Sequence, residues 1–353
     1  MLTPTQFKEI KAHLERAQNP LFLFDNDQDG LCSFLLLQKF IGRGKGFPAK
    51  SFPDLNSTYF RKVIELKADY VFILDKPVVS PSFFEEAEKY NIPVVWIDHH
   101  EIPGFNPEAL PKFVSYYNPV YNKNSSNEPV TVLSYEITQR KEDLWLAVAG
   151  SVFDHYYPDY YIDFQKKFPD LCIDSKEPFE IFYKSEIGKI SKMLGFGLKD
   201  RTTEVINMLK FLIKAKTPYD VLEENSFNKN IHSRFDDLNK KYQKLVSKAL
   251  EIGWTLKKEE KILYFQYAGD LSISGDLSNE LNFIFPDKVI LVAYVKGTKA
   301  NISIRGKKIR PKLLKAIEGL EGATGGGHED AVGAQVRIED IEIFRKNFEK
   351  LIE

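Results

Sequence analysis

The chain has 353 residues, 43% of them hydrophobic, and a formal net charge of −1. This length and composition allow buried cores for about two domains, and the balanced charge excludes recognition of nucleic acid or membrane by overall charge. Two cysteines are too few for a disulfide framework or a cysteine zinc site. The amphipathic N-terminus is unlike a signal peptide and no apolar run is long enough to span a membrane, so we predict a soluble, cytoplasmic protein without a membrane partner.

Short apolar runs alternate with helical patterns in the first part of the chain. The segments expected to form strands are 21–25, 70–74 and 94–97, and those expected to form helices are 30–40, 57–67, 83–90 and 144–156. This alternation is typical of βαβ units with a parallel sheet. Because ligands bind beyond the carboxyl ends of parallel strands, the residues that follow each strand are the first candidates for a site.

Acidic and imidazole side chains follow all three predicted strands. They are Asp25, Asp27 and Asp29 after the first strand, Asp75 after the second, Asp98, His99 and His100 after the third, and Asp154 at the end of the last helical segment. Such carboxylates repel one another unless cations lie between them, and the set suits Mg²⁺ or Mn²⁺, with imidazole favouring Mn²⁺. Two such ions, about 3.5–4 Å apart, would activate water for attack on phosphorus.

Each of these motifs has a simpler interpretation when it stands alone. The segment DNDQDG (25–30) fits a calcium loop or a solvated turn, but the calcium loop needs a glutamate at its twelfth position, which is Leu36. Asp75 could cap a turn, Asp154 could be a surface residue, and DHH is short enough to occur by chance. Their combination, in order and on one sheet edge, favours the metal site.

The remainder of the chain has a different pattern. Residues from about 155 to 229 are expected to form a helical insertion, with helices at 185–197 and 202–216, and 230–252 is predicted to be one long linker helix. The smaller α/β domain that follows is expected to contain strands 261–267, 289–295, 300–305 and 334–338, helices 278–285 and 311–320, a glycine loop at 324–328 and a closing helix. We therefore divide the chain into a catalytic domain (1–229, with the insertion), a linker helix (230–255) and a second domain (256–353).

A cationic segment lies in the second domain. Residues 296–315 contain eight lysines or arginines and no acid, shortly before the sequence TGGGH (324–328). Glycines let backbone amides approach a phosphate closely, so the two segments together favour a nucleic-acid contact. The alternative for the charge run is a solvated face.

An aromatic run lies near the predicted active edge. It comprises Phe153, Tyr156, Tyr157, Tyr160, Tyr161 and Phe164. These side chains could stack on bases or could form the core of the insertion, and core packing is the favoured interpretation.

Together the motifs resemble the DHH phosphoesterase superfamily, in particular its DHH–DHHA1 branch, which includes RecJ-like exonucleases and nanoRNase-type oligoribonucleases. The resemblance is carried by FDNDQDG (24–30), LD (74–75), IDHHE (97–101), GSVFD (150–154) and TGGGHEDAVGA (324–334). It implies an α/β fold in which a parallel-sheet DHH domain is joined by a long linker helix to a smaller α/β DHHA1 domain, with the active cleft between them.

The resemblance also implies roles for individual residues. The implied ligands of two Mn²⁺ (or Mg²⁺) ions are Asp75 as the bridge, Asp27 for one ion, and Asp29, His99 and Asp154 for the other. The implied catalytic group is Asp75, His99, His100 and Asp98, in which His100 would contact the scissile phosphate and Asp98 would orient a histidine. The residues implied to hold the nucleic-acid end are Arg305, Gly325, Gly326, Gly327 and His328.

One position departs from the pattern of many relatives, which have a histidine four residues before Asp27. Leu23 stands there, and the additional Asp25, which RecJ-like members share, is expected to complete the shell of the first ion. A single ion, or a weakened first site, stays open as the alternative.

The activity implied by the resemblance is that of a metal-dependent exonuclease that releases nucleotides from single-stranded DNA or RNA. Two alternatives use the same scaffold: an enzyme for short substrates (an oligoribonuclease, small-substrate phosphatase or cyclic-dinucleotide phosphodiesterase), and an inactive scaffold in replication or repair. The presence of all the expected ligands favours activity. We consider a replication or repair helicase as a candidate protein partner. We also consider a homodimer as a candidate assembly. The polarity of digestion and the choice between DNA and RNA are not specified by the sequence.

Overall fold

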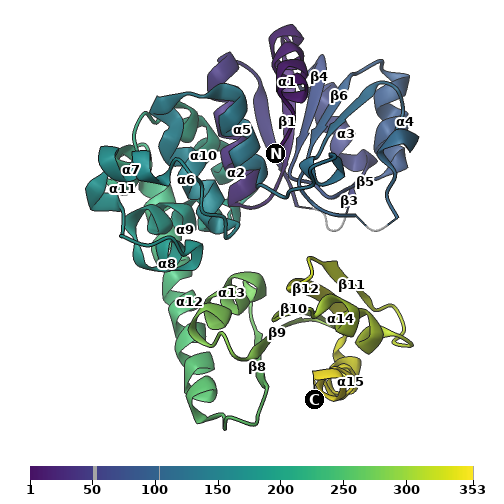
Figure 1. The fold of residues 1–353 in the computed structure, drawn as a ribbon, viewed down its shortest axis with the longest axis vertical. Coiled ribbons are helices and arrows are strands. Elements are labelled where there is room, and N and C mark those ends of the chain that lie inside the picture. Colours follow the sequence, from purple (N-terminus) through teal and green to yellow (C-terminus); the bar gives the residue numbers. More distant parts are fainter. Residues whose placement is uncertain (51–53, 103, 353) are drawn as a thin grey trace. The chain divides into compact units, whose positions relative to one another are not determined.

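The computed structural model describes residues 1–50, 54–102 and 104–352. They form two compact units, Met1–Phe235 and Asp236–Glu353, and the long helix α12 (Lys229–Thr255) contributes to both (Figure 1). This helix confirms the one predicted at 230–252. Among the described residues, no helix combines the length and the apolar character needed to cross a membrane.

A parallel sheet forms the centre of the first unit. Its order is β2-β1-β4-β6-β7, and all neighbouring strands are parallel. The strands are β1 (Pro20–Asp25), β2 (Lys45–Ala49), β4 (Tyr70–Leu74), β6 (Val94–Ile97) and β7 (Val114–Tyr117), with a separate short pair, β3 (Asp54–Leu55) and β5 (Val78–Val79). The three predicted strands are confirmed as the central ones. The sequence pattern missed the two edge strands, and β2 contains Pro48, which an edge strand tolerates.

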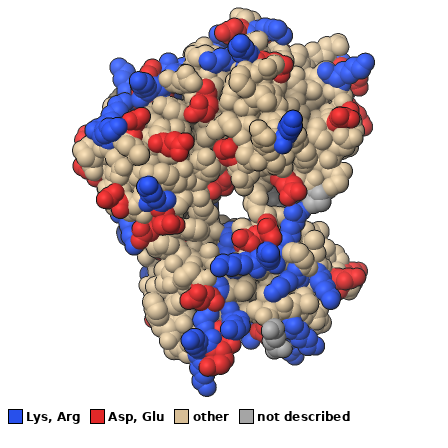
Figure 2. Space-filling view, in the orientation of Figure 1, with Lys and Arg blue, Asp and Glu red and all other residues tan. Residues whose placement is uncertain are grey.

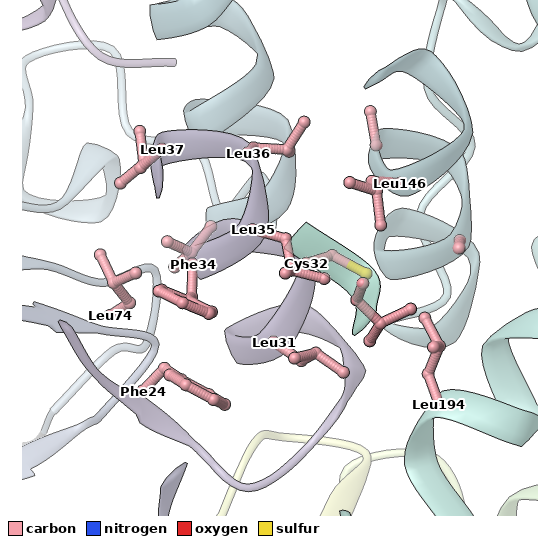
Figure 3. Close-up of a cluster of buried hydrophobic side chains, with 14 of the residues drawn as sticks. Phe24, Leu31, Cys32, Phe34, Leu35, Leu36, Leu37, Leu74, Leu146 and Leu194 are labelled. Carbon is pink, nitrogen blue, oxygen red and sulfur yellow. The ribbon is translucent and has the colours of Figure 1, made fainter. Parts of the chain in front are cut away.

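Helices cover both faces of this sheet. They are α1 (Pro4–Arg16), α2 (Gln28–Ile41), α3 (Phe60–Glu65), α4 (Pro81–Lys89), α5 (Val130–Thr138) and α6 (Leu144–Phe153). The predicted helix 57–67 is shorter, because residues 57–59 form a 3-10 turn before α3. Helix α2 is buried almost all round, which explains its unbroken run of leucines, and Phe34 stacks on Phe24 with ring centroids 5.2 Å apart (Figure 3).

The insertion is helical, as predicted. Its helices are α7 (Tyr161–Lys167), α8 (Pro178–Lys184), α9 (Glu186–Leu198), α10 (Thr202–Lys214) and α11 (Tyr219–Leu222). From α9, Leu194 packs in the same cluster as Leu31 of α2 and Leu146 of α6 (Figure 3). Of the aromatic run, Tyr161 and Phe164 are fully buried in this cluster, which supports core packing for that segment rather than base stacking.

The second unit has its own sheet, of order β11-β12-β10-β9-β8. Its elements are β8 (Ile262–Ala268), α13 (Ser274–Ile284), β9 (Val289–Lys296), β10 (Lys299–Arg305), α14 (Arg310–Ile317), β11 (Thr324–Gly327), β12 (Ala331–Arg337) and α15 (Ile341–Ile352). The predicted strands and helices are confirmed, but the predicted glycine loop is wrong for 324–327. These residues pair antiparallel with β12 as an edge strand, and the backbone pairing outweighs the low strand propensity of glycine.

Candidate metal centre

The three central strands of the first sheet end in register. Phe24, Leu74 and Ile97 are paired neighbours in β1, β4 and β6. The acidic residues at or directly after these positions therefore lie side by side at one sheet edge; they are Asp25, Asp75 and Asp98. Asp75 has a left-handed backbone (φ 58°), a conformation that aspartate tolerates and that is concentrated at functional sites.

The close approach of α2 to the end of β1 depends on Gly30, the third residue of the helix. A side chain at Gly30 would place its Cβ 2.5 Å from the carbonyl oxygen of Asp25, so only glycine allows helix and strand to approach this closely. The Asp27 carboxylate caps α2, because its Oδ1 accepts the Gly30 N–H at 3.0 Å.

A second helix holds Asp29. Both of its carboxylate oxygens accept backbone N–H groups at the start of α5, from Val130 at 2.8 Å and from Thr131 at 2.7 Å. The positive end of the helix dipole favours the ionised carboxylate there. Asp29, only 1% exposed, is thereby fixed in a direction that leaves its Oδ2 4.0 Å from His99 Nε2.

His99 is at the centre of the site. Its Nδ1 lies 3.2 Å from the carbonyl oxygen of Asn127, which can only accept, so Nδ1 carries the hydrogen and Nε2 presents its lone pair in the neutral ring. Besides Asp29, Nε2 faces Asp75 Oδ1 at 3.3 Å and Asp154 Oδ2 at 3.6 Å. Four electron-pair donors thus converge on one small volume, three of them on buried side chains and the fourth on the partly exposed Asp154.

This convergence fits a cation. Among the described residues, two groups bring three possible ligand atoms within 4.8 Å of one another: Asp29, His99 and Asp154, and Asp75, His99 and His100. Oδ1 of Asp75 is buried and accepts no conventional hydrogen bond within the described part of the chain. Mixed carboxylate and imidazole ligands suit Mn²⁺. The first group contains the three residues implied for one ion of the predicted pair.

The pKa values reflect the crowding of buried charge. Burial, followed by the charge of Asp29, raises the pKa of Asp75 well above its usual value, and burial raises the pKa of Asp154 to about 6. For His99, burial by itself lowers the pKa, but Asp154, Asp75 and Asp29 together raise it well above its usual value. The metal-free site therefore retains protons that a divalent ion has to displace.

We therefore expect Mn²⁺ binding at this candidate site to depend on pH. Because the folded, metal-free protein holds more protons than the unfolded chain between about pH 4 and the raised pKa of His99, its stability is expected to decrease as the pH rises through this window. Mn²⁺ affinity has the opposite dependence. As the pH is lowered below about 6, the affinity is expected to fall about tenfold per pH unit for each proton that the ion displaces. Calorimetric titration at several pH values measures this, with EDTA-treated protein as the reference. A constant affinity from pH 5 to 8 would contradict the site.

His100 and Asp98 form a pair beside this group. His100 Nδ1 lies 2.8 Å from Asp98 Oδ1, and the backbone oxygen of His100 accepts the side-chain N–H of Asn118 at 2.9 Å. Burial alone would raise the pKa of Asp98, but His100 and, to a smaller extent, His99 more than offset this and lower it. The ionised Asp98 therefore orients the His100 ring, whose side chain is 22% exposed.

The two side chains expected around the first ion, Asp25 and Asp27, already accept hydrogen bonds within the protein. Asp25 Oδ1 lies 2.8 Å from Nζ of Lys76, and neither Asp25 nor Asp27 belongs to a three-ligand group within the described residues. Leu23 is fully buried in the hydrophobic core and offers no ligand atom. The sequence reasoning missed Lys76; the only signal was a cation directly after Asp75, at the end of a strand.

The second unit brings the other predicted residues together at one end of its sheet. Arg305 pairs with Ala331 across β10 and β12, while Gly327 pairs with Val332 across β11 and β12. The N–H of His328 donates to the Ala331 carbonyl at 2.9 Å. Gly327 has φ 128°, and a Cβ there would lie 2.5 Å from that same carbonyl oxygen, so the position requires glycine.

The second unit carries many lysines and arginines close in sequence to Arg305. Figure 2 shows them gathered on the visible face of the second unit, where β10, β12 and α14 lie in Figure 1. The Arg305 guanidinium is held in place by Asn279 Oδ1 and by the carbonyl oxygen of Ile304. Gly325 and Gly326 lie in β11 at the sheet edge, where a strand presents backbone N–H groups outward.

Two family models match the chain. Residues 21–156 match the DHH family N-terminal domain, and residues 259–353 match the DHHA1 domain. The chain belongs to the DHH phosphoesterase superfamily, in the branch that joins a DHH domain to a DHHA1 domain.

Solved structures share this fold at low sequence identity. RecJ from Thermus thermophilus in complex with Mn²⁺ matches with a TM-score of 0.69 and 14% identity, covering 99% of this chain and 55% of that one. A manganese-bound exonuclease RecJ matches with a TM-score of 0.66 and 14% identity, covering 99% and 94%. A pGpG-specific phosphodiesterase from Vibrio cholerae matches with a TM-score of 0.50 and 13% identity, covering 95% and 99%. No curated protein sequence matches.

Proposed function

We propose that this chain is a divalent-metal-dependent phosphodiesterase that removes nucleotides from an end of single-stranded DNA or RNA. The observation that carries the proposal is the convergence of Asp29, His99 and Asp154, with Asp75 beside them, at the carboxyl edge of the parallel sheet. Two solved RecJ structures of the same fold hold manganese, which supports Mn²⁺ as the ion.

The residues of the first unit would divide the chemistry. Asp29, Asp75, His99 and Asp154 would hold the ion, which when bound supplies a Lewis acid for a phosphoryl oxygen and activates water for in-line attack. The Asp98 carboxylate accepts a hydrogen bond from Nδ1 of His100. The other ring nitrogen, Nε2, would therefore be the one that contacts the scissile phosphate.

The second unit would hold the nucleic acid. Arg305 offers a planar set of donors suited to phosphate, and it lies at the same end of the sheet as Gly327 and His328. Around it, the cationic segment 296–315 supplies long-range attraction to the backbone of the strand. Binding and chemistry would thus fall to different units of the chain.

End-labelled oligonucleotides test the proposal. With Mn²⁺, the purified chain is expected to release nucleotides stepwise from one end of a single strand, and EDTA is expected to stop the reaction. Labels at the 5′ and the 3′ end, on DNA and on RNA, give the polarity and the preferred sugar. If no phosphodiester is hydrolysed at any Mn²⁺ concentration, the proposal is wrong and the inactive scaffold is favoured.

A second candidate is a phosphodiesterase for very short substrates, which the fold shared with the pGpG-specific enzyme supports. Substrate length separates the two candidates. An exonuclease is expected to retain its rate as the substrate lengthens from a dinucleotide, because a longer strand gains contacts with the second unit. A rate confined to dinucleotides would favour the second candidate.

A further inference from the structure

Lys76 is a buried cation at the edge of the metal centre. It follows Asp75 directly, is only 2% exposed, and its backbone oxygen accepts the indole N–H of Trp96 at 2.8 Å. Its Nζ lies 2.8 Å from Asp25 Oδ1. Lysine is almost never fully buried unless it is paired, so this contact is a built part of the site.

The pairing changes what Asp25 offers to a metal ion. A carboxylate oxygen that accepts a charge-assisted hydrogen bond from an ammonium is a weaker ligand, and a divalent ion placed beside that ammonium would be repelled by it. Asp27, the other ligand expected beside Asp25, accepts a neutral backbone N–H at its Oδ1, as Asp29 does at both oxygens, so these contacts bring no positive charge. Lys76 therefore supplies, next to Asp25, the positive charge that a second metal ion would otherwise bring.

The other carboxylate and imidazole groups of the centre converge on one another. The groups of possible ligand atoms found within the described residues comprise Asp29, Asp75, His99, His100 and Asp154. Three carboxylate oxygens lie around His99 Nε2, at 3.3, 3.6 and 4.0 Å. The centre therefore contains two different arrangements, an internal ion pair and a set of converging donors.

We propose that the Lys76 ammonium takes the charge role of one metal ion, so that this chain holds a single tightly bound Mn²⁺ ion instead of two. The inference rests on the proposed metal-dependent function and specifies the composition of its centre. It assigns Lys76 as a positioning residue, which neutralises Asp25 and keeps that carboxylate away from the resident ion.

The number of Mn²⁺ ions retained per chain tests this directly. Wild-type protein, loaded with Mn²⁺ and then dialysed, is expected to keep one ion by elemental analysis and to show the isolated six-line EPR signal of Mn²⁺. Asp25→Asn is expected to keep the same count, because Asp25 is not a ligand. Lys76→Met, which removes the ammonium at similar volume, is expected to gain a second ion and the broadened signal of a coupled pair.

Lys39→Met is the matched control. Lys39 is another largely buried lysine of the same unit, 9% exposed at its side chain, with Nζ 3.7 Å from Asp143. Its replacement is expected to leave the count at one, because Asp143 belongs to neither ligand group. Circular dichroism and thermal melting check that each variant is folded.

The outcomes separate this inference from the proposed function. Two ions in the wild type, falling to one in Asp25→Asn, would overturn the role of Lys76 while leaving a metal-dependent phosphodiesterase intact. No retained ion, together with no Mn²⁺-dependent hydrolysis, would overturn the proposed function itself. If Lys76→Met does not fold, the wild type and Asp25→Asn still decide between the hypotheses. A role for Lys76 in place of an ion predicts one Mn²⁺ ion in both proteins, whereas a two-ion centre predicts two ions in the wild type and one in Asp25→Asn.

Discussion

Asp75→Asn is expected to reduce hydrolysis of a labelled oligonucleotide by well over about 100-fold. About 100-fold is the largest typical effect of removing a residue that only orients a metal ligand, and Asp75 is proposed to be a ligand itself. The reason is that Asp75 Oδ1 faces both His99 Nε2, at 3.3 Å, and His100 Nδ1, at 3.7 Å. An amide cannot supply the negative charge that a divalent ion needs there, whether one ion is held or two. Turnover is measured over a wide range of Mn²⁺ concentrations.

The substitution is chosen to leave the fold unchanged. Asparagine tolerates the left-handed backbone of position 75 (φ 58°), whereas most other residues would strain it. Because burial already disfavours the ionised carboxylate, the metal-free variant is expected to melt no lower than the metal-free wild type, but to gain less stability from Mn²⁺.

A surface aspartate of the same unit provides the control. Asp159→Asn changes an exposed aspartate and is expected to keep wild-type turnover. Near-normal activity of Asp75→Asn at any Mn²⁺ concentration would show that the catalytic centre lies elsewhere.

Arg305→Ala is expected to weaken binding of a single-stranded oligonucleotide by about 1.5–3 kcal/mol, the range for a charge-assisted hydrogen bond, or about 10- to 150-fold. The guanidinium lies at the end of the second sheet where Gly327 and His328 also lie. The salt dependence of binding is expected to decrease by about one phosphate contact. Fluorescence anisotropy at several salt concentrations measures both quantities.

A minimal ester separates binding from chemistry in this variant. Hydrolysis of bis-p-nitrophenyl phosphate is expected to change far less than that of an oligonucleotide, because the ester is too small to gain strand contacts. Arg345→Ala is the matched control, since Arg345 is a guanidinium of the same unit that pairs with Glu349 at 2.7 Å on α15. Equal losses on both substrates would place Arg305 in folding or catalysis, and unchanged oligonucleotide binding would leave the cationic segment as a solvated face.

The parallel sheet, and the edge at which the candidate site lies, could be predicted from the order of residues alone. Apolar runs separated by helical patterns specify buried parallel strands, and such strands end at a common edge, so the residues that follow them must meet. The approach of Asp75 and His99 follows from this rule, because each comes directly or almost directly after a central strand. The single Asp154 could be placed because the apolar pattern of α6 ends one residue before it.

The use of each carboxylate, by contrast, depends on contacts between distant parts of the chain. The Asp29 oxygens are taken by the first amides of α5, about a hundred residues further along the chain, and no local pattern encodes that contact. Whether Lys76 points to solvent or to Asp25 depends on its rotamer and on the burial around it, not on its place after Asp75. The strand β11 is a local case, since it pairs as a hairpin with β12, which follows it after a short connection, and the backbone hydrogen bonds of the pair outweigh the preference of three glycines for a loop.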